Sequence, residues 1–364
     1  MNKVYHIVSN KDWGGGEQYI YDLANRQIAN GFFVEILCRP IKTIADKFRE
    51  LQIPIHLLSL NGLSDIRSAW YIAKLLKKQK KCIIHVHNFK DAFTAAFARK
   101  FAGRKDVHIV LSRHITRKGK NTILYRWLYR QLDWLSFDSQ VSRDEFYSTQ
   151  PSMPQKKTGI IRTSIVLPTK IERANVRQLF NIDENKVIGM YHGRLHPEKG
   201  LDILIKAVSL LRDKSLCVLI VGSGSEEYTT HLQDLIEELC LDEMIVLAGF
   251  RHPVFPFLAD ADFGILPSIV KEGCPLSPQE YMSQGLPVVV TNNGGQREYI
   301  EDRINGLLVA PGDIQALAEA IGFMVDDVEF RQQLGRQAKI DFSEKLSYDF
   351  LYNQITRLYG QLGI

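Results

Sequence analysis

The sequence has few cysteines and no long apolar run. Its five cysteines are odd in number, widely spaced and never at metal-ligand spacing, which excludes a disulfide scaffold and a cysteine-based zinc site. No apolar stretch approaches the roughly 20 residues that span a bilayer, and the first residues lack the apolar core and cleavage site of a signal peptide. We therefore expect reduced, mostly buried thiols and a cytoplasmic protein.

The chain also has no low-complexity tract, and its 13 prolines and 25 glycines are too few for a linker-rich or disordered protein. Hydrophobic residues make up 45% and charged residues 24% of the composition, as in folded globular proteins. At 364 residues the chain is too long for one compact core. Two domains of ordinary size are therefore expected.

Charge is divided unevenly between the two halves. Residues 1–170 contain 29 Lys and Arg against 13 Asp and Glu, a net charge of +16. Residues 171–364 contain 17 against 28, a net charge of −11, and the two values sum to +5. The basic half predicts an anionic partner, and charge alone leaves open whether this is a membrane surface, a phosphorylated substrate or nucleic acid.

Short apolar runs alternate with segments of helical periodicity, and after an irregular passage at 151–168 the alternation starts again. The expected strands are Val4–Ser9, Phe33–Cys38, Ile53–Leu58, Cys82–His87, Val107–Ser112, Val187–His192, Leu216–Gly222, Met244–Gly249, Phe263–Pro267, Leu286–Thr291 and Gly306–Val309. This order predicts an α/β fold of two doubly wound Rossmann-like domains, 1–165 and 166–364, facing a cleft. A final helix at 342–363 has an apolar face that could pack back on the first domain.

Two glutamates lie close together in the run Glu272-Gly-Cys-Pro-Leu-Ser-Pro-Gln-Glu280. The pattern Ser277-Pro278-Gln279-Glu280 is typical of a helix start, with serine as N-cap and glutamate at the third position, and Gly285 is expected to end that helix. Taken singly, Glu280 is explained as a capping residue and Glu272 as an ordinary loop acid. Together they can face one site beside a helix N-terminus.

A second pattern follows the predicted strand at 187–192. The run His192-Gly-Arg-Leu-His-Pro-Glu-Lys-Gly200 places Arg194 and Lys199 around a strand-to-helix turn. The free amides and positive dipole end of a helix N-terminus favour phosphate, and an arginine fork with a lysine point charge suits a diphosphate. The alternative is that both are solvated surface charges.

The first half has two weaker patterns. The triplet Gly14-Gly15-Gly16 follows the first strand and precedes a helix, so the backbone there can approach a ligand closely, but it is not the dinucleotide fingerprint G-x-G-x-x-G. His87 and His114 stand at strand ends, where a ligand of such a sheet would lie. A lone strand histidine is more often structural, so neither pattern decides by itself.

Residues 113–135 combine basic, aromatic and apolar side chains. Leu124, Trp127, Leu128, Leu132 and Leu135 fall at helical spacing with arginines between them. Such a segment could lie on an anionic membrane surface, each nearby cation contributing about 1 kcal/mol. More often, a helix of this kind only covers a sheet.

Taken together, these motifs resemble family 4 of the retaining glycosyltransferases, which have the GT-B fold. The resemblance rests on the glycine triplet, on Gly-Arg-x-x-x-Glu-Lys-Gly from Gly193, on Val221-Gly-Ser-Gly224, and on the two-glutamate run followed by Gly285-Leu-Pro-Val-Val-Val-Thr and Gly294-Gly295. It is strong from about 187 to 312 and looser before. The chain departs from the family pattern at Thr163-Ser164, where the family has Asn-Gly, and at Tyr281, where it has alanine.

The resemblance implies roles for particular residues. Glu272 would contact the hydroxyls of the donor sugar, Glu280 the nucleotide ribose, and Arg194 with Lys199 the diphosphate. His114 would lie near the reacting centre. The remaining residues expected to bind the donor are Gly15, Gly16, Phe250, Arg251, Cys274 and Leu276. Retention would follow from attack on the front face, with neither cofactor nor metal ion, and a uridine diphosphate donor is typical of the family.

The resemblance predicts a transferase that moves a hexose or acetamido-hexose from a nucleotide sugar to a glycan or glycolipid acceptor. The basic first half favours a lipid-linked acceptor, and the protein would then be peripheral on the inner face of the cytoplasmic membrane. The alternatives are an enzyme with a soluble acceptor and a nucleotide-sugar-binding subunit without activity. Nucleic acid is not expected as a partner, because no known reader motif is present.

Overall fold

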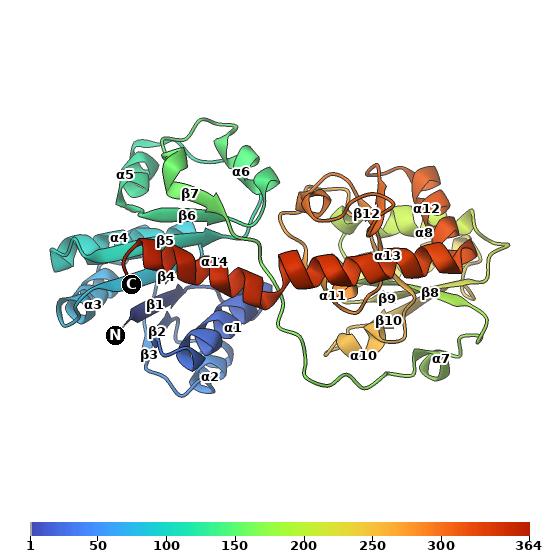
Figure 1. The fold of residues 1–364 in the computed structure, drawn as a ribbon, viewed down its shortest axis with the longest axis horizontal. Coiled ribbons are helices and arrows are strands. Elements are labelled where there is room, and N and C mark those ends of the chain that lie inside the picture. The colour runs from blue at the N-terminus through green and yellow to red at the C-terminus, as the bar shows by residue number, and fades with distance from the viewer. Residues whose placement is uncertain (1) are drawn as a thin grey trace. The chain divides into compact units, whose positions relative to one another are not determined.

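The computed structural model describes residues 2–364 and divides the chain into two compact units. Unit 1 holds the residues up to Thr163 together with Tyr348–Ile364, and unit 2 holds Ser164–Ser347. The division at 163 lies close to the boundary predicted after residue 165. The last helix belongs to unit 1, so the chain passes between the units twice (Figure 1).

Unit 1 is built on a parallel sheet of seven strands in the order β3-β2-β1-β4-β5-β6-β7. Its strands are β1 Lys3–Val8, β2 Phe33–Cys38, β3 Ile55–Leu57, β4 Cys82–Val86, β5 Val107–Arg113, β6 Trp134–Phe137 and β7 Thr158–Ile160. Its helices are α1 Gly15–Ala29, α2 Lys42–Arg49, α3 Ile66–Lys77, α4 Phe89–Ala102, α5 Ile123–Gln131, α6 Gln140–Tyr147 and α14 Tyr348–Gln361.

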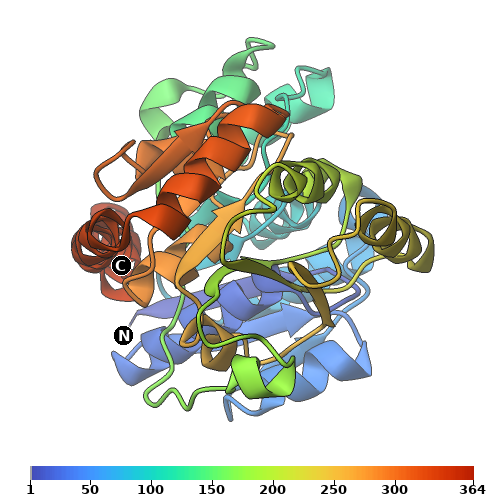
Figure 2. The same cartoon turned by 90° about the vertical axis from the view of Figure 1, so that its right-hand side faces the viewer.

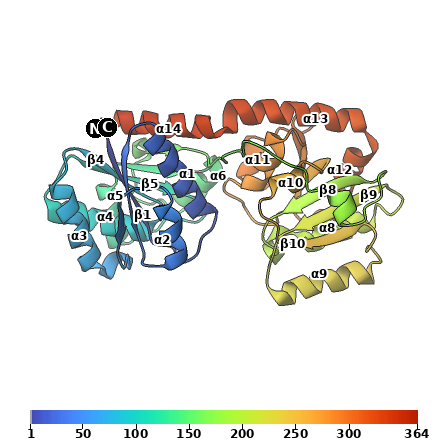
Figure 3. The same cartoon turned by 90° about the horizontal axis from the view of Figure 1, so that it is seen from below.

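The helices of unit 1 cover both faces of its sheet. Side chains of α3, α4 and α5 form one apolar core with one face of the strands, and side chains of α1, α2 and α14 form another core with the opposite face. Figure 3 shows α14 beside α1, where Gln27 of α1 donates a hydrogen bond to the hydroxyl of Tyr359. Because both faces are covered, most residues of the strands are apolar, and polar side chains such as His6 and His85 are buried among them.

Two strands of unit 1 were not predicted. The segment expected to continue as a helix to Leu135 ends its helix α5 at Gln131, and Trp134–Phe137 forms strand β6. The short strand β7 lies in the passage expected to be irregular. The prediction was wrong because the apolar residues before and after Leu132 match a helical period by chance, and only pairing with β5 makes the second group a strand.

Unit 2 is built on a parallel sheet of six strands in the order β10-β9-β8-β11-β12-β13. Its strands are β8 Val187–His192, β9 Leu216–Val221, β10 Ile245–Gly249, β11 Phe263–Leu266, β12 Val288–Thr291 and β13 Gly306–Val309. Its helices are α7 Val176–Leu179, α8 Leu201–Ser209, α9 Glu226–Glu238, α10 Phe255–Leu258, α11 Leu276–Ser283, α12 Ile314–Asp326 and α13 Val328–Asp341. Figure 2 views the molecule from the side of this unit, whose strands and helices share one apolar core.

The predicted helix at 342–363 is interrupted in the structure. Residues Phe342–Leu346 form a π-helical turn after α13, and α14 begins only at Tyr348. Leu346 packs in the core of unit 2, whereas Leu351 and Ile355 pack in unit 1. The apolar residues therefore serve two cores, and the predicted continuous face was wrong.

The fold shows where the cysteines lie and whether any helix could cross a membrane. Cys38, Cys82 and Cys217 are buried, and burial raises the pKa of the Cys38 thiol to about 11. Cys274 is half-buried and Cys240 is exposed, so three of the five thiols are buried. Among residues 2–364, no helix combines the length and the apolar character that a bilayer crossing requires.

Tyr281, where the family pattern has alanine, is fully buried under β11. A methyl group added at Gly264 would come within 2.2 Å of the Tyr281 ring, so the missing side chain of Gly264 makes the room that the tyrosine fills. The tyrosine hydroxyl donates to the backbone oxygen of Met190 at 2.7 Å. The departure from the family pattern is thus compensated by local packing.

We expect Gly264→Ala to lower the free energy of unfolding by about 1–3 kcal/mol, because the added methyl overpacks the core against Tyr281. Chemical denaturation of the full chain measures this. Gly360→Ala is the matched control, since nothing lies within 4 Å of the added group there. Adding Tyr281→Ala removes the collision, so the double variant should lose less than the sum of the single losses. Additive losses would contradict the packing relationship.

A chain of buried polar groups crosses the core of unit 1. His6 on β1 lies 2.8 Å from the side-chain oxygen of Gln27 and 3.2 Å from Nε2 of His87. His85 on β4 lies 2.7 Å from the Tyr359 hydroxyl through Nδ1. Burial lowers the pKa of His6 to about 4, and it lowers the pKa of His85 and His87 well below 6.5. The three rings are therefore neutral in the folded protein.

Lowered folded-state pKa values predict loss of stability in mild acid. The unfolded chain binds protons near pH 6.5, so the stabilisation is complete above that pH and is lost as the pH falls toward 4. Burial of His6 and of His114 should each lower the free energy of unfolding by about 2 kcal/mol between pH 7.5 and 5. Unfolding in urea at pH 7.5 and 5.0 measures the loss.

Burial raises the pKa of Asp91 to about 7, so this carboxyl group gains stability for the folded state as the pH falls and partly masks the histidine effect. The test therefore compares the pH dependence of the unfolding free energy between variants. His6→Gln should flatten the pH dependence. His252→Gln, at an exposed position of unit 2, should leave it unchanged. Equal slopes in wild type and His6→Gln would show that His6 is not the group that titrates.

Candidate functional site

The strand order of unit 2 reverses between β8 and β11, and the predicted diphosphate-binding residues lie there. After β8 the chain turns through Gly193 and the 3-10 turn Pro197–Lys199 into α8. After β11 it forms a loop that leads to α11. Loops that leave in opposite directions from neighbouring strands open a crevice at the carboxyl edge of a parallel sheet, which is where ligands of such sheets bind.

Lys199 and Glu272 form an ion pair across this reversal point. Lys199 Nζ lies 2.5 Å from Glu272 Oε1, and both side chains are about one-sixth exposed. The Ser268 hydroxyl donates to the same carboxylate oxygen at 2.7 Å. Arg194 lies on the same turn as Lys199 and is exposed. The structure thus brings together, in one loop pair, two cations and the first glutamate of the predicted set.

Glu280 is held by a second contact in the same unit. Its carboxylate lies 2.5 Å from Nε2 of His192, the last residue of β8. Nδ1 of His192 lies 2.8 Å from the Tyr281 hydroxyl, which itself donates to the backbone oxygen of Met190. The histidine ring is therefore fixed on one side, and it orients the carboxylate on the other.

The helix that holds Glu280 begins earlier than predicted. Helix α11 starts at Leu276 with Pro275 as the N-cap, and no side chain caps it. Ser277 and Pro278 lie inside the first turn, so the predicted capping box was wrong and Glu280 lies in the second turn. The reason is that Pro275, at φ −64° and ψ 136°, already has the extended conformation that precedes a helix. Gly285 does end the helix, with φ +76°.

The glycines of this region allow loops to pack tightly. A methyl group at Gly222 would lie 1.8 Å from the oxygen of Gly193, and one at Gly224 would lie 2.1 Å from that of Leu195. Leu195 also receives support from Ser223, whose carbonyl accepts its N–H at 2.8 Å. The Val221–Gly224 motif therefore acts as a support on which the loop of Arg194 rests.

Glu272 has a similar backbone support. The N–H of Gly295 donates to the carbonyl of Glu272 at 2.9 Å, and a methyl at Gly294 would lie 2.7 Å from that carbonyl. Only a side chain as small as hydrogen fits between the two loops. The Gly294-Gly295 pair thus fixes where Glu272 stands.

The other predicted donor-binding residues of unit 2 occupy the same edge of the sheet. Phe250 follows β10 and is 69% exposed, so it is free to meet a ligand. The Nε of Arg251 donates to the backbone oxygen of Ala248 at 2.9 Å, and its guanidinium lies 5.9 Å from the centre of the Phe257 ring. Cys274 receives a hydrogen bond from Gln279, and Leu276 opens α11.

Unit 1 has its own pocket at the carboxyl edge of its sheet, with a volume of about 330 Å³. Gly16, His87, Arg113 and His114 are among the residues that line it, so it contains two predicted residues, Gly16 and His114. Nothing lies within 4 Å of a side chain that would be added at Gly16, which leaves the start of α1 open. Gly15 is the first residue of that helix.

The two pocket histidines carry free acceptor sites. Because the Gln27 oxygen only accepts, His6 donates from Nε2, so its Nδ1 accepts from Nε2 of His87. His87 Nδ1 is then a lone pair, and it is buried without a partner. Both nitrogens of His114 are also buried without a partner, and burial lowers the pKa of His114 to about 4. The pocket wall thus offers neutral imidazoles to a ligand hydroxyl.

The nitrogens of His6, His85 and His87 lie within 4.8 Å of one another, the spacing of a metal site. Both nitrogens of His6 and both of His85 already have hydrogen-bond partners. A divalent ion would have to break these contacts and would leave its charge buried without an anion, at high cost. Hydrogen bonding alone therefore explains why the three rings lie together.

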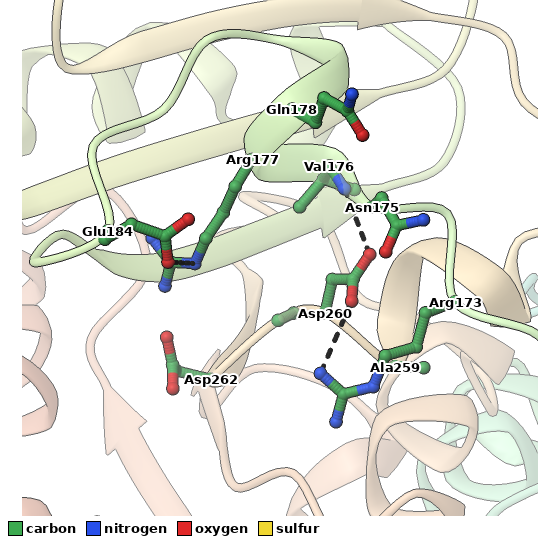
Figure 4. Close-up of a pocket in the computed structure, with 10 residues that line it drawn as sticks. Arg173, Asn175, Val176, Arg177, Gln178, Glu184, Ala259, Asp260 and Asp262 are labelled. Carbon is green, nitrogen blue, oxygen red and sulfur yellow. Dashed lines mark hydrogen bonds and ion pairs between the residues drawn. The ribbon is translucent and has the colours of Figure 1, made fainter.

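Another cavity of unit 2, about 590 Å³, lies elsewhere (Figure 4). Its carboxylates are used internally: Asp260 accepts from the N–H of Val176 at 3.0 Å and pairs with Arg173 at 3.5 Å, and Asp262 accepts from the N–H of Ile188. Asp262 directly precedes β11, so this cavity is at the amino edge of the sheet. Ligands of parallel sheets bind at the opposite edge, and we assign it no role.

Sequence reasoning missed three residues that the structure places in the site. His192 and Ser268 hold the two glutamates, and Tyr281 fixes His192. His192 and Ser268 stand at the carboxyl ends of neighbouring strands, which was the available indication. Glu272 lies four residues after Ser268, and Glu280 lies 88 residues after His192. Neither contact could be predicted from the sequence.

The chain matches two family models. "Glycosyltransferase Family 4" covers residues 13–167, and "Glycosyl transferases group 1" covers residues 172–341. An uncharacterized glycosyltransferase of Methanocaldococcus jannaschii is 28% identical over 78% of this chain and 76% of its own length. The Escherichia coli UDP-Gal:alpha-D-GlcNAc-diphosphoundecaprenol alpha-1,3-galactosyltransferase is 24% identical over 81% of each chain.

Solved structures share the fold. The Anabaena Alr3699/HepE structure in complex with UDP has a TM-score of 0.84 at 20% identity and covers 99% of this chain and 100% of that chain. A glycosyltransferase of Rickettsia africae has a TM-score of 0.86 at 18% identity, covering 99% and 98%. The predicted fold class is confirmed by these structures and by the two doubly wound sheets. The chain is a member of the group 1, family 4 glycosyltransferases with the GT-B fold.

Proposed function

We propose that the protein transfers a hexose or acetamido-hexose, with retention, from a uridine diphosphate sugar to a growing lipid-linked glycan of the cell surface. Family membership supports the transferase reaction. The donor and acceptor classes are those in the name of the Escherichia coli relative, and a lipopolysaccharide N-acetylglucosaminetransferase of Salmonella typhimurium is also similar, at 29% identity over 48% of this chain. The HepE structure binds UDP.

The observation that carries the proposal is the Lys199–Glu272 pair at the reversal point of the unit 2 sheet, with Arg194 on the same turn. In glycosyl transfer, negative charge grows on the departing diphosphate while positive charge grows on the anomeric carbon. Fixed cations that meet the growing negative charge lower the barrier. Lys199 and Arg194 have this role in the proposal, and no metal ion is needed for it.

The two glutamates then bind and orient the donor. Glu272, at the end of the loop after β11, would receive hydroxyls of the sugar, and Glu280, held by His192, would receive those of the ribose. They are not an acid pair for hydrolysis, because each is already engaged with a cation or an imidazole. The acceptor hydroxyl would transfer its proton to the leaving phosphate.

The acceptor is assigned to the pocket of unit 1. Its neutral histidines, His87 and His114, offer lone pairs that can accept hydrogen bonds from sugar hydroxyls, and the open start of α1 at Gly15 and Gly16 offers amides. A soluble acceptor would use the same chemistry, so the acceptor class must be tested directly.

The test is incubation of the protein with a panel of nucleotide sugars, with and without a short-chain lipid diphosphate sugar as acceptor, in the presence of EDTA. The proposal expects release of UDP, transfer only when the acceptor is present, and an α-linked product from an α-linked donor by NMR. Transfer to free sugar phosphates but not to the lipid-linked acceptor would favour a soluble acceptor. Absence of any donor turnover, including slow hydrolysis, would favour a binding subunit.

Lys199→Gln and Arg194→Gln are each expected to reduce kcat about a hundredfold, roughly 3 kcal/mol of transition-state stabilisation. Binding of UDP should weaken while binding of uridine stays unchanged, because only the diphosphate meets these cations. Isothermal calorimetry and steady-state kinetics measure both. Lys206→Gln removes an exposed lysine from α8 and is the control. Unchanged kcat in both site variants would refute the assignment.

Glu280→Ala should weaken binding of the nucleotide sugar and of the bare nucleotide, whereas Glu272→Ala should affect mainly the nucleotide sugar. The reason is that the ribose is present in both ligands and the sugar in one. Thermal shift at a fixed ligand excess reports the two affinities, since a ligand stabilises the folded state by RT ln(1 + [L]/Kd). Glu301→Ala, at an exposed position, is the control. Equal losses for both ligands in both variants would contradict the separate roles.

A further inference from the structure

Helix α3 has an outer face that is apolar and aromatic instead of polar. Ile66 is 62% exposed, Trp70 56% and Tyr71 41%, and Leu63, in the turn before the helix, is 43% exposed. The opposite face of the helix, with Ile72 and Leu76, is buried in the core of unit 1. A helix that packs on a globular core normally carries polar residues outside. The outer face of α3 therefore exposes apolar surface that the fold does not use.

The same face is strongly basic. Arg67, Lys74 and Lys77 interleave with the exposed aromatic residues at helical spacing, and Lys78, Lys80 and Lys81 follow the helix end. Between Glu50 and Asp91 the only acidic residue is Asp65, which is buried as the N-cap of α3. The ammonium of Lys74 lies 3.6 Å from the centre of the Trp70 ring. Arg67, Lys74, Lys77 and Lys78 thus stand beside the apolar stripe, and no residue from 51 to 90 places an exposed carboxylate next to them.

The segment that the sequence singled out for membrane contact, 113–135, buries most of the apolar side of its helix. Leu128, Tyr129 and Leu132 are buried in unit 1, and Trp127 stacks on Phe97 at 5.0 Å. The large apolar side chains that remain exposed there are Ile115, before α5, and Ile123 and Leu124 at the start of the helix. The apolar side of α5 therefore covers the sheet and its neighbouring helix, which is the alternative that the sequence left open.

We propose that the outer face of α3, together with the lysines that follow it, docks on the anionic surface of a lipid bilayer. The combination is specific: tryptophan and tyrosine suit the headgroup level, isoleucine and leucine reach the acyl boundary, and the lysines meet anionic headgroups. An acidic protein face or a nucleic acid would match the charge but would leave the exposed Ile66 and Leu63 without an apolar partner. The inference goes beyond the proposed function, because docking requires no catalysis.

The test is flotation of the full chain with vesicles of phosphatidylcholine and phosphatidylglycerol in a 7:3 ratio, and with phosphatidylcholine alone. We expect binding to the anionic vesicles only, decreasing with salt. The triple variant Lys74→Glu, Lys77→Glu, Lys78→Glu should reduce the partition coefficient at least a hundredfold, since each surface cation contributes about fivefold to it. The matched control, Lys100→Glu, Lys105→Glu, Lys156→Glu, makes the same charge change at exposed lysines of unit 1 outside α3 and outside 113–135, and should bind nearly as wild type.

Trp70 provides a second readout. Lipids that carry a bromine or nitroxide quencher in the upper acyl chain should quench tryptophan fluorescence in wild type, and Trp70→Phe should abolish the quenching while preserving flotation. Trp13, Trp127 and Trp134 are less exposed and are expected to be insensitive. Donor turnover, measured in detergent with a short-chain acceptor, should be unchanged in all α3 variants.

Several outcomes would overturn the proposal. Equal flotation of the α3 and control triple variants would show that binding is a general effect of charge. Binding to neutral vesicles as strong as to anionic ones, or quenching that persists in Trp70→Phe, would remove the assigned surface. Absence of wild-type flotation with tight binding of a 20-nucleotide single strand would assign the face to nucleic acid. If the wild type showed no donor turnover, the proposed function would be refuted, but the flotation and quenching results would still decide whether α3 docks on the bilayer.

Discussion

The reversal of strand order between β8 and β11 is the constraint on which the proposed donor site depends. These strands are neighbours in the sheet, yet their carboxyl ends lead into separate loops. The ion pair of Lys199 with Glu272 links the two loops, and the contact of Glu280 with His192 links α11 back to β8. Each acidic side chain is thereby held by a basic group from the other side of the reversal. A ligand that binds there would meet preoriented groups instead of having to order them.

Glycines make this arrangement possible for a steric reason. At Gly222, Gly224 and Gly294 a side chain would collide with backbone atoms of the loops that carry Arg194 and Glu272. The loops can therefore approach to hydrogen-bonding distance, and the charged residues are placed by backbone contacts. Gly264 does the same for a side chain, since it admits the ring of Tyr281, which in turn fixes His192.

The core of unit 1 differs from that of unit 2, because it contains a chain of buried polar groups. His6, His85 and Gln27 would each be costly to bury alone, and the cost is offset by the partners that they supply to one another and by Tyr359 of α14. The chain ends at His87, whose free lone pair lies at the pocket. The last helix, which returns from unit 2, therefore contributes to the protonation pattern of the pocket and also to the apolar core.

The sequence by itself determined the two-sheet α/β architecture, most strands, and the residue types of the site, because parallel strands buried on both faces are continuous apolar runs and phosphate-binding turns have a fixed local pattern. It could not determine β6 and β7, whose few residues are strands only through pairing with β5 and with each other. The interruption of the helix before Tyr348 could not be predicted either. Leu346 and Leu351 are equally apolar, and they differ only in which unit's core buries them. The tertiary structure alone decided which histidine holds Glu280, which tautomer His87 adopts and which helix leaves its apolar face exposed, because each depends on contacts between residues far apart in the chain.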